Sequence, residues 1–366
     1  MACDAYTRWP EGLKAPFPYF GGKRRVAAEV WRRFGDVRNY VEPFFGSGAV
    51  LLARPLPFVG AETVNDLDSM LCNLWRSLQQ APDEVARWAD WPVNEVDVYA
   101  RHQWLLKRKP GLSEWLRADP DACDPKAAGW WVWGMSIWIG CGFCDDSNAA
   151  ENRRPHLESG SGVARHVHLG RSYEVQSKRP YLGKSMPGVG RGAATAQMKL
   201  PYLWGQGMGT HGTVHRERLY EYFDALAERL RHVRVCCGDW SRICGRTPTY
   251  FHGLTGVFLD PPYDPALRSR NLYTEDADGL SHAVQDWAVE QGKNPLMRIA
   301  LCGYEGEHEM PDDWEILAWK TAGGMARLGS GGQGSVNKER ERVWFSPACL
   351  RSDAEHVEQL SLLEVR

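Results

Sequence analysis

Residues 39–52 constrain the fold of this chain more than any other segment. Asn39-Tyr40-Val41-Glu42-Pro43 has the composition of a short strand. Phe44-Phe45-Gly46-Ser47-Gly48 follows as a glycine turn, and Ala49-Val50-Leu51-Leu52 is the apolar start of a helix. A strand that runs through a glycine loop into a helix is typical of α/β folds that bind a ligand at the helix N-terminus.

The apolar pattern around this unit predicts strands alternating with helices. Helices are expected from about Met70 and at 219–230 and 280–290, and strands at 57–64, 233–237, 256–259, 298–302, 314–319 and 342–345. Residues 77–139 have the pattern of helices broken by prolines, whereas 140–212 lack periodic apolar positions. We therefore expect a Rossmann-like α/β domain built from residues 15–76 and 213–350, an insertion at 77–212 and a tail at 351–366.

Composition places the chain among ordinary globular proteins, since 43% of its 366 residues are apolar and 25% are charged. No apolar run is long enough for a membrane span and no signal peptide is evident, which favours the cytosol without a membrane partner. Ten cysteines in this length do not form a disulfide framework. Residues 130–138, with four tryptophans, are expected to form a buried helix, with a base-stacking surface as the alternative.

A carboxylate follows the second expected strand. Asp66 lies about 20 residues after the glycine loop, where α/β folds place a carboxylate that holds ribose hydroxyls. The alternative role is a helix N-cap, for which Asp68 is as good a candidate. No Lys-Ser or Lys-Thr follows the glycine loop, so a nucleoside without phosphates fits it better than a nucleotide does.

Asp260-Pro261-Pro262-Tyr263 ends the apolar strand Val257-Phe258-Leu259. These residue types suit chemistry on an adenine amine. Such an amine is a poor nucleophile, because its lone pair is delocalised into the ring. A carboxylate and a backbone carbonyl that accept its hydrogens localise that pair, and an aromatic ring holds the base once it has left the helix stack. The diproline would fix the backbone so that both acceptors converge, although Asp-Pro-Pro alone is also compatible with a strand-terminating turn.

These segments together resemble the D12 class of adenine-N6 DNA methyltransferases, which includes the Dam-type enzymes. The resemblance rests on their order along the chain: Phe20-Gly21-Gly22-Lys23, Glu42 to Gly48, Asn65-Asp66, a long insertion, Gly238-Asp239-Trp240 and Asp260 to Tyr263. This order fits the α group, in which the target-recognition region precedes the catalytic motif. Phage-encoded members are the most similar in character.

The resemblance implies a Rossmann-like methyltransferase fold, S-adenosylmethionine as cofactor, double-stranded DNA as substrate and Asp260, Pro261, Pro262 and Tyr263 as catalytic residues. It implies reaction in the cytoplasm, that of the host cell for a phage-encoded enzyme, and it allows a restriction endonuclease as functional partner. The implied cofactor contacts are Tyr19, Phe20, Gly21, Gly22, Lys23, Glu42, Pro43, Phe44, Gly46, Ser47, Gly48, Asp66, Asp239, Trp240 and Asp260.

The insertion carries a basic, glycine-rich stretch that is expected to contact DNA, with a solvated loop as the alternative. Its candidate residues are Arg153, Arg154, Arg165, Arg171, Lys178, Arg179, Lys184 and Arg191. The glycine-rich segment 323–337 is a second candidate: it either orders on DNA or is a disordered loop. Cys141 and Cys144 have no second pair at zinc-site spacing, so no metal is expected.

Two other functions stay open at this point. Cytosine-N4 and RNA enzymes share the fold but more often carry Ser or Asn in place of Asp260, and a DNA-binding protein without catalysis would occupy sites only. Cytosine-C5 methylation would require a cysteine nucleophile beside a proline, and none of the ten cysteines follows a proline. Recognition sequence, oligomeric state and the size of the transferred group do not follow from the residues.

Overall fold

The computed structural model describes residues 13–17, 23–92, 95–137, 143–144, 213–263, 279–319 and 340–351. The chain divides into two compact units. We call the first the sheet unit, which takes residues 21–67, 232–270 and 276–366, and the second the helical unit, which takes 1–20, 68–231 and 271–275.

The sheet unit contains one seven-stranded sheet in the order β3-β2-β1-β4-β5-β7-β6. Its strands are β1 (Asn39–Glu42), β2 (Ala61–Asp66), β3 (Val233–Cys237), β4 (Thr255–Leu259), β5 (Met297–Tyr304), β6 (Glu315–Ala318) and β7 (Glu341–Phe345). The first five in spatial order pair in parallel, whereas β7 runs antiparallel between β5 and β6. The carboxyl ends of β1 to β5 and the amino end of β7 therefore lie at one edge, which we call the carboxyl edge.

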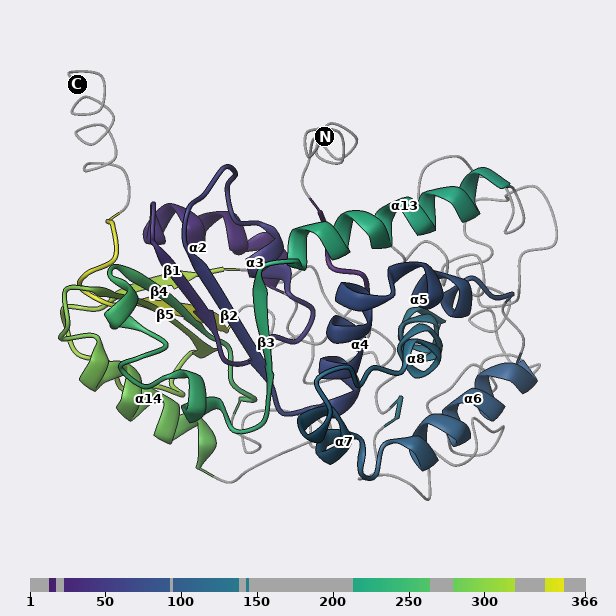
Figure 1. Cartoon of the computed structure of the whole chain (residues 1–366). Helices are drawn as coiled ribbons and strands as arrows, with labels where there is room; N and C mark the ends of the chain where they lie inside the picture. Colours follow the sequence, from purple (N-terminus) through teal and green to yellow (C-terminus); the bar gives the residue numbers. More distant parts are fainter. Residues whose placement is uncertain are drawn as a thin grey trace, which may run out of the picture. The chain divides into compact units, whose positions relative to one another are not determined.

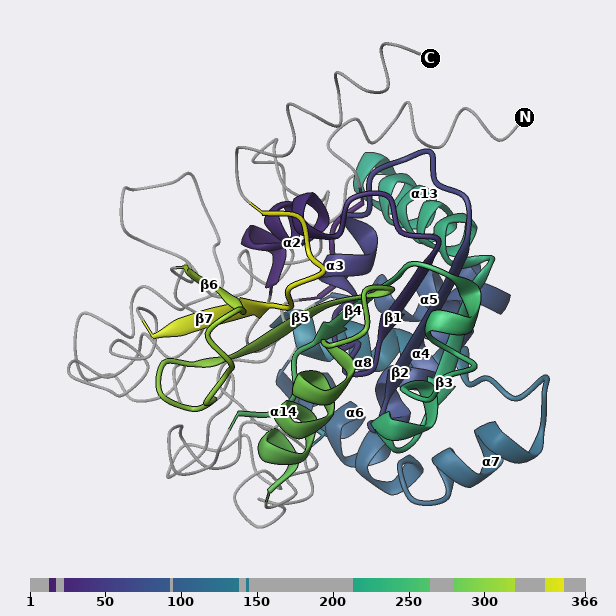
Figure 2. The same ribbon diagram turned by 90° about the vertical axis from the view of Figure 1, so that its left-hand side faces the viewer.

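Helices cover both faces of this sheet (Figures 1 and 2). Helices α2 (Ala27–Phe34) and α3 (Ala49–Leu52) lie on one face and α14 (Leu280–Gln291) on the other. On the α14 face, alternate residues of the central strands, such as Val257 and Ile299, form a buried apolar core with Val284. The expected α/β alternation is confirmed.

Two elements differ from the sequence expectation. Helix α2 was not anticipated, although Val30, Trp31 and Phe34 are buried at helical spacing. Strand β2 begins at Ala61, not at 57, because its pairing with β1 starts at Asn39↔Ala61. Gly60 precedes it at φ +150° against the backbone of Arg38, where a side chain would clash.

The helical unit consists of α4 (Ser69–Gln80), α5 (Pro82–Ala89), α6 (Glu95–Arg108), α7 (Leu112–Ala118), α8 (Pro125–Ile137) and α13 (Thr213–Leu230) in its described part. Helices α5 and α8 begin at prolines, as proline's missing N–H allows. Trp131 and Trp133 are buried, so the helix prediction for this tryptophan-rich segment is confirmed. None of the described helices combines the length and apolar character needed to cross a membrane.

The helical unit extends further than the expected insertion at 77–212, because it begins at Asp68 and continues to Arg231. Helix α13 packs against α4 and α5. In addition, the side chain of Gln79 donates a hydrogen bond to the Leu230 carbonyl at 2.8 Å. The helices at both ends of the insertion thus share its core.

Candidate active site

The carboxyl edge brings together residues that are far apart in the sequence. Connections leave β1 in one direction, through β2 to β3, and the chain then returns to β4 on the other side of β1. Ligands of open α/β sheets bind at such a switch point, outside the carboxyl ends of the two strands. Glu42 ends β1, and Asp260 follows the last residue of β4.

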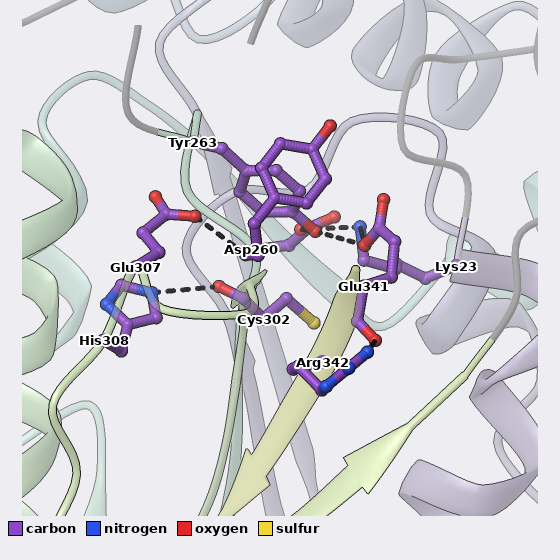
Figure 3. A network of polar contacts seen from close by, with 9 residues as sticks. Lys23, Asp260, Tyr263, Cys302, Glu307, His308, Glu341 and Arg342 are labelled. Atoms are coloured by element: carbon purple, nitrogen blue, oxygen red, sulfur yellow. Dashed lines mark hydrogen bonds and ion pairs between the residues drawn. The ribbon is translucent and has the colours of Figure 1, made fainter. Parts of the chain in front are cut away.

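Asp260 is held through one of its two carboxylate oxygens (Figure 3). Nζ of Lys23 lies 2.8 Å from Oδ1 of Asp260, and the hydroxyl of Tyr263 lies 3.3 Å from the same atom. Within the described residues, Oδ2 accepts no hydrogen bond from the protein. The Asp260 side chain retains 18% exposure, while Lys23 is 3% exposed. Asp260 is therefore anchored on one side and has an acceptor oxygen left on the other.

Tyr263 donates its hydroxyl hydrogen to Oε2 of Glu341 at 2.8 Å. The ring is 2% exposed and packs edge-to-face on Tyr304, with centroids 4.5 Å apart. Nζ of Lys23 lies 5.1 Å from its centroid. The ring that the sequence assigned to the target base is thus packed inside the sheet unit in this structure.

Burial raises the pKa of three carboxyl groups at this edge. Desolvation raises the pKa of Asp260, and the neighbouring Lys23 ammonium opposes that shift. Desolvation likewise raises the pKa of Glu341, again opposed by Lys23. The pKa of Glu42 is raised well above its usual range by burial, although a 2.8 Å hydrogen bond from the Tyr40 hydroxyl opposes this. The buried Lys23 ammonium therefore favours the charged form of two of these groups, Asp260 and Glu341.

The glycine loop after β1 is shaped by two residues with positive φ, Gly46 at +48° and Gly48 at +67°. The Gly46 N–H donates to Oδ2 of Asp66 at 2.9 Å, so Asp66, the predicted ribose ligand, also supports the glycine loop. Asp68 instead caps helix α4, because its Oδ1 accepts from the Met70 N–H at 2.8 Å. The two aspartates thus have different roles, and the N-cap alternative is confirmed for Asp68.

Asn65 was not among the predicted site residues, yet it joins two loops of the carboxyl edge to strand β2. Its Nδ2 donates to the carbonyls of Pro43 at 3.1 Å and Gly238 at 2.8 Å, and its carbonyl accepts from the Phe45 N–H at 2.9 Å. Asn65 is 1% exposed, and its Oδ1 has no hydrogen-bond partner in the described part of the chain. The sequence shows only an asparagine directly before the predicted ribose carboxylate, which does not reveal the loops that Asn65 joins.

Asp239 and Trp240 follow β3 and form the start of the short helix η2 (Trp240–Ile243). Asp239 is exposed and caps this helix by accepting from the Ser241 N–H at 2.9 Å. The Trp240 ring stacks on Phe44 of the glycine loop with centroids 6.1 Å apart. The structure thus joins these two predicted cofactor contacts, Phe44 and Trp240, through an aromatic stack.

Several predicted residues lie outside the described part of the chain. These are Tyr19, Phe20, Gly21 and Gly22, the eight candidate DNA contacts between Arg153 and Arg191, Cys141, and the segment 323–337. Cys144 is described and is buried. Among the described residues no group of His, Cys, Asp and Glu has the arrangement of a metal site.

The carboxyl edge also contains Glu341, Glu307 and His308, which sequence reasoning missed. Glu307 is buried and accepts from the Ser281 hydroxyl at 2.7 Å and the Tyr304 N–H at 2.8 Å. His308 packs over Gly303, whose added Cβ would approach its ring within 2.6 Å. Glu307 and His308 lie on the loop after β5, which folds back on that strand, whereas Glu341 comes from β7 (Figure 3).

Residues 19–102 match the family model of the D12 class N6 adenine-specific DNA methyltransferases. The matched segment contains Lys23, the glycine loop, Asn65 and Asp66. A comparison with curated proteins found no match. The mostly parallel seven-stranded sheet agrees with the Rossmann-like methyltransferase fold that the family implies. Residues 19–102 are therefore similar to the D12 class of N6 adenine-specific DNA methyltransferases.

Proposed function

We propose that this chain uses S-adenosylmethionine to methylate N6 of an adenine extruded from duplex DNA, with Asp260 as the acceptor for the target amine. The observation that carries this proposal is the arrangement of the Asp260 carboxylate. Oδ1 is occupied by Lys23, while Oδ2 accepts no hydrogen bond from the described residues. An anchored carboxylate with one available oxygen suits an acceptor for an amine hydrogen.

The residues of the carboxyl edge fit this cofactor. Gly46 and Gly48 leave backbone without side chains beside β1, which lets a ligand approach closely. The buried Oδ1 of Asn65 lacks a donor within the described residues, and Asp66 supplies a carboxylate next to it. These acceptors suit the hydroxyl and amino groups of a nucleoside with an amino-acid chain. We assign Glu42, Pro43, Ser47 and the glycines to its methionine part, Asp66 to its ribose and Asp239 to its adenine side.

When bound, S-adenosylmethionine supplies a methyl group on a positively charged sulfur. Asp260 and the Pro261 carbonyl then act on the adenine amine by accepting its two hydrogens, which concentrates the lone pair on nitrogen. Lys23 favours the charged form of Asp260, because an ammonium 2.8 Å away opposes protonation of the buried carboxyl. The chain thus orients the amine and increases the electron density on its nitrogen, without a covalent enzyme intermediate.

Adenine N6 is paired inside the duplex, so the base must leave the stack to reach Asp260. Tyr263 is then the aromatic ring nearest the acceptor, although it must first lose part of the packing described above. We assign DNA binding to the basic residues between Arg153 and Arg191, on the basis of their charge. The order of the segments supports membership of the α group, and a DNA substrate places the reaction in the cytoplasm.

The test is methyl transfer by Asp260→Ala to duplex DNA from cofactor labelled in its methyl group. Mass spectrometry of the resulting nucleosides distinguishes N6-methyladenine from N4-methylcytosine. We expect transfer to fall below detection while cofactor binding, measured by calorimetry, persists. Retained turnover in this variant, or N4-methylcytosine as the wild-type product, would contradict the proposal.

A further inference from the structure

We propose that Glu341, the first residue of β7, is a positioning residue for methyl transfer: it takes the Tyr263 hydroxyl hydrogen and thereby keeps Asp260 available to the target amine. This inference rests on the proposed function, because it assigns a role relative to Asp260. Glu341 does not need to touch the substrate for it. It acts through Tyr263 and Lys23.

Glu341 reaches the carboxyl edge only because β7 runs antiparallel. In the pairing of β5 with β7, Glu341 lies opposite Tyr304, the last residue of β5. The pairing uses backbone groups alone, so nothing in the sheet requires a carboxylate here. The side chain is nonetheless 6% exposed. Burying a carboxylate is costly unless partners compensate it, which points to a reason outside the sheet.

The partners of Glu341 are the two groups that also contact Asp260. The Tyr263 hydroxyl lies 2.8 Å from Glu341 and 3.3 Å from Asp260. It carries a single hydrogen, which goes to the nearer acceptor. Nζ of Lys23 lies 3.9 Å from Glu341 and 2.8 Å from Asp260. Glu341 thus accepts the hydroxyl hydrogen of Tyr263, while Asp260 forms the shorter ion pair with Lys23.

Removing Glu341 would redirect that hydrogen. Asp260, whose Oδ1 lies 3.3 Å from the Tyr263 hydroxyl, then accepts it. A carboxylate that already accepts from a tyrosine and a lysine is a weaker acceptor for an amine. The loss of Glu341 should therefore reduce the rate of transfer more than the binding of either substrate.

The pH dependence separates this role from a structural one. The charged groups that face Asp260 are Lys23 from η1 (Lys23–Arg25), Glu42 from β1, Glu307 from the loop after β5 and Glu341 from β7, and the Cys302 thiol faces it from β5. Removing the Glu341 charge and gaining a hydrogen bond from Tyr263 both lower the pKa of Asp260. The acid limb of the rate profile should move to lower pH.

The experiment compares Glu341→Gln and Glu341→Ala with the wild type, using labelled cofactor and duplex DNA. We expect kcat to fall about 10- to 100-fold, the range that one hydrogen bond to a charged group typically controls. KM for cofactor and for DNA should stay within about twofold, since the substitution does not remove a contact that binds either substrate in the ground state. Glu305→Gln is the matched control, because that residue lies at the same edge but is 62% exposed. Thermal melting verifies that the variants fold. If Glu341→Ala does not fold, the test rests on Glu341→Gln, which nearly preserves the shape of the side chain.

A double-mutant cycle with Tyr263→Phe completes the test. Without the hydroxyl there is no hydrogen to redirect, so Glu341→Gln should cost less in this background than in the wild type. Additive losses, or a lower kcat with an unmoved acid limb, would overturn the positioning role. Failure of the proposed function has a different signature, namely a wild-type enzyme without adenine methylation or an active Asp260→Ala variant.

Discussion

The ammonium group of Lys23 lies 2.8 Å from Oδ1 of Asp260, so a residue near the start of the chain controls the charge of the carboxylate after β4. Lys23 is buried in the short helix η1, which precedes α2. Desolvation raises the pKa of Asp260, and Lys23 lowers it. Their balance sets the pH at which Asp260 could serve as the proposed acceptor.

Lys23→Met is therefore expected to move the acid limb of kcat/KM to higher pH. In its proposed role Asp260 must be ionised to accept hydrogen from the amine, and its pKa rises when the neighbouring positive charge is removed. Activity is then lost at a higher pH as the pH falls, and at neutral pH we expect a loss of about 100-fold or more.

The pH–rate profile of purified enzyme is the measurement. Lys293→Met serves as control, because Lys293 is 69% exposed in the loop before β5, at the opposite edge of the sheet. An acid limb that stays in place in Lys23→Met would separate Lys23 from the ionisation of Asp260.

Asp66 and Asp68 offer a matched pair for testing cofactor binding. Asp66→Ala removes the acceptor that holds the Gly46 N–H, along with the proposed contact to ribose. We expect the cofactor Kd to rise at least about tenfold, as for loss of a hydrogen bond to a charged group. Asp68→Asn keeps an efficient N-cap for α4 and should bind cofactor normally. Calorimetry measures both, and equal affinities of the two variants would contradict the assignment of Asp66.

Much of the sheet unit follows from local sequence patterns, because strands such as β3 and β4 are short, mostly apolar runs followed by Gly238 and Asp260. The strand predicted at 233–237 agrees with β3 at both ends. Pro82 and Pro125 mark the helix starts, since a proline at the first turn removes no hydrogen bond. The sequence also brings forward Asp260 and the glycine loop, whose residue types are unusual outside a binding site.

The remaining site depends on long-range geometry. Glu341 lies in a charged run, Lys338-Glu339-Arg340-Glu341-Arg342, which by itself is typical of an exposed segment. Only the antiparallel direction of β7 carries it to the carboxyl edge. Asn65 likewise gains its role from the loops that β1 and β3 bring beside β2. Strand order and direction, which local patterns do not encode, decide both cases.

Asn65→Asp tests the joining of these loops. The substitution preserves shape but replaces the Nδ2 donor by an oxygen that faces two carbonyls, those of Pro43 and Gly238. We expect a loss of about 2–4 kcal/mol in the free energy of unfolding, from two hydrogen bonds and the new repulsion.

Urea unfolding monitored by circular dichroism measures this loss. Asn294→Asp is the control, because Asn294 uses only its oxygen, which accepts from the Leu296 N–H at 3.0 Å. Equal stability of the two variants would show that Asn65 does not hold the loops together.

Substitutions of Arg33 and Arg32 in α2 test which side chain fixes this helix to strand β6. Arg33 is 4% exposed, and its guanidinium binds both carboxylate oxygens of Glu315 in β6, at 2.5 and 2.7 Å, as well as Glu29. Arg33→Met should cost about 3 kcal/mol in unfolding free energy, because it removes two hydrogen bonds to Glu315 and one to Glu29 from a partly buried network. Arg32→Met removes a cation that is 64% exposed and should cost less than about 1 kcal/mol. Similar losses in chemical denaturation would argue against a structural role for the Arg33 network.

Glu42 allows a test in which stability and function move in opposite directions. Burial raises its pKa well above the usual range in the folded protein. A carboxyl group whose pKa is raised by folding contributes stability at low pH, and this contribution is lost as the pH rises through the folded-state value. Glu42→Gln removes the buried charge and still offers an oxygen to the Tyr40 hydroxyl.

We therefore expect Glu42→Gln to melt a few degrees above the wild type at pH 8 and at nearly the same temperature at pH 5. Cofactor affinity should fall, because the carboxylate is assigned to the methionine part of the ligand. Glu62→Gln on neighbouring β2 is the contrasting variant, since Glu62 is buried but pairs with Arg54 at 3.1 Å. Weakening that ion pair should lower the melting temperature at pH 8. A Glu42→Gln variant that is less stable than the wild type at pH 8 would show that the folded protein benefits from the ionised carboxylate.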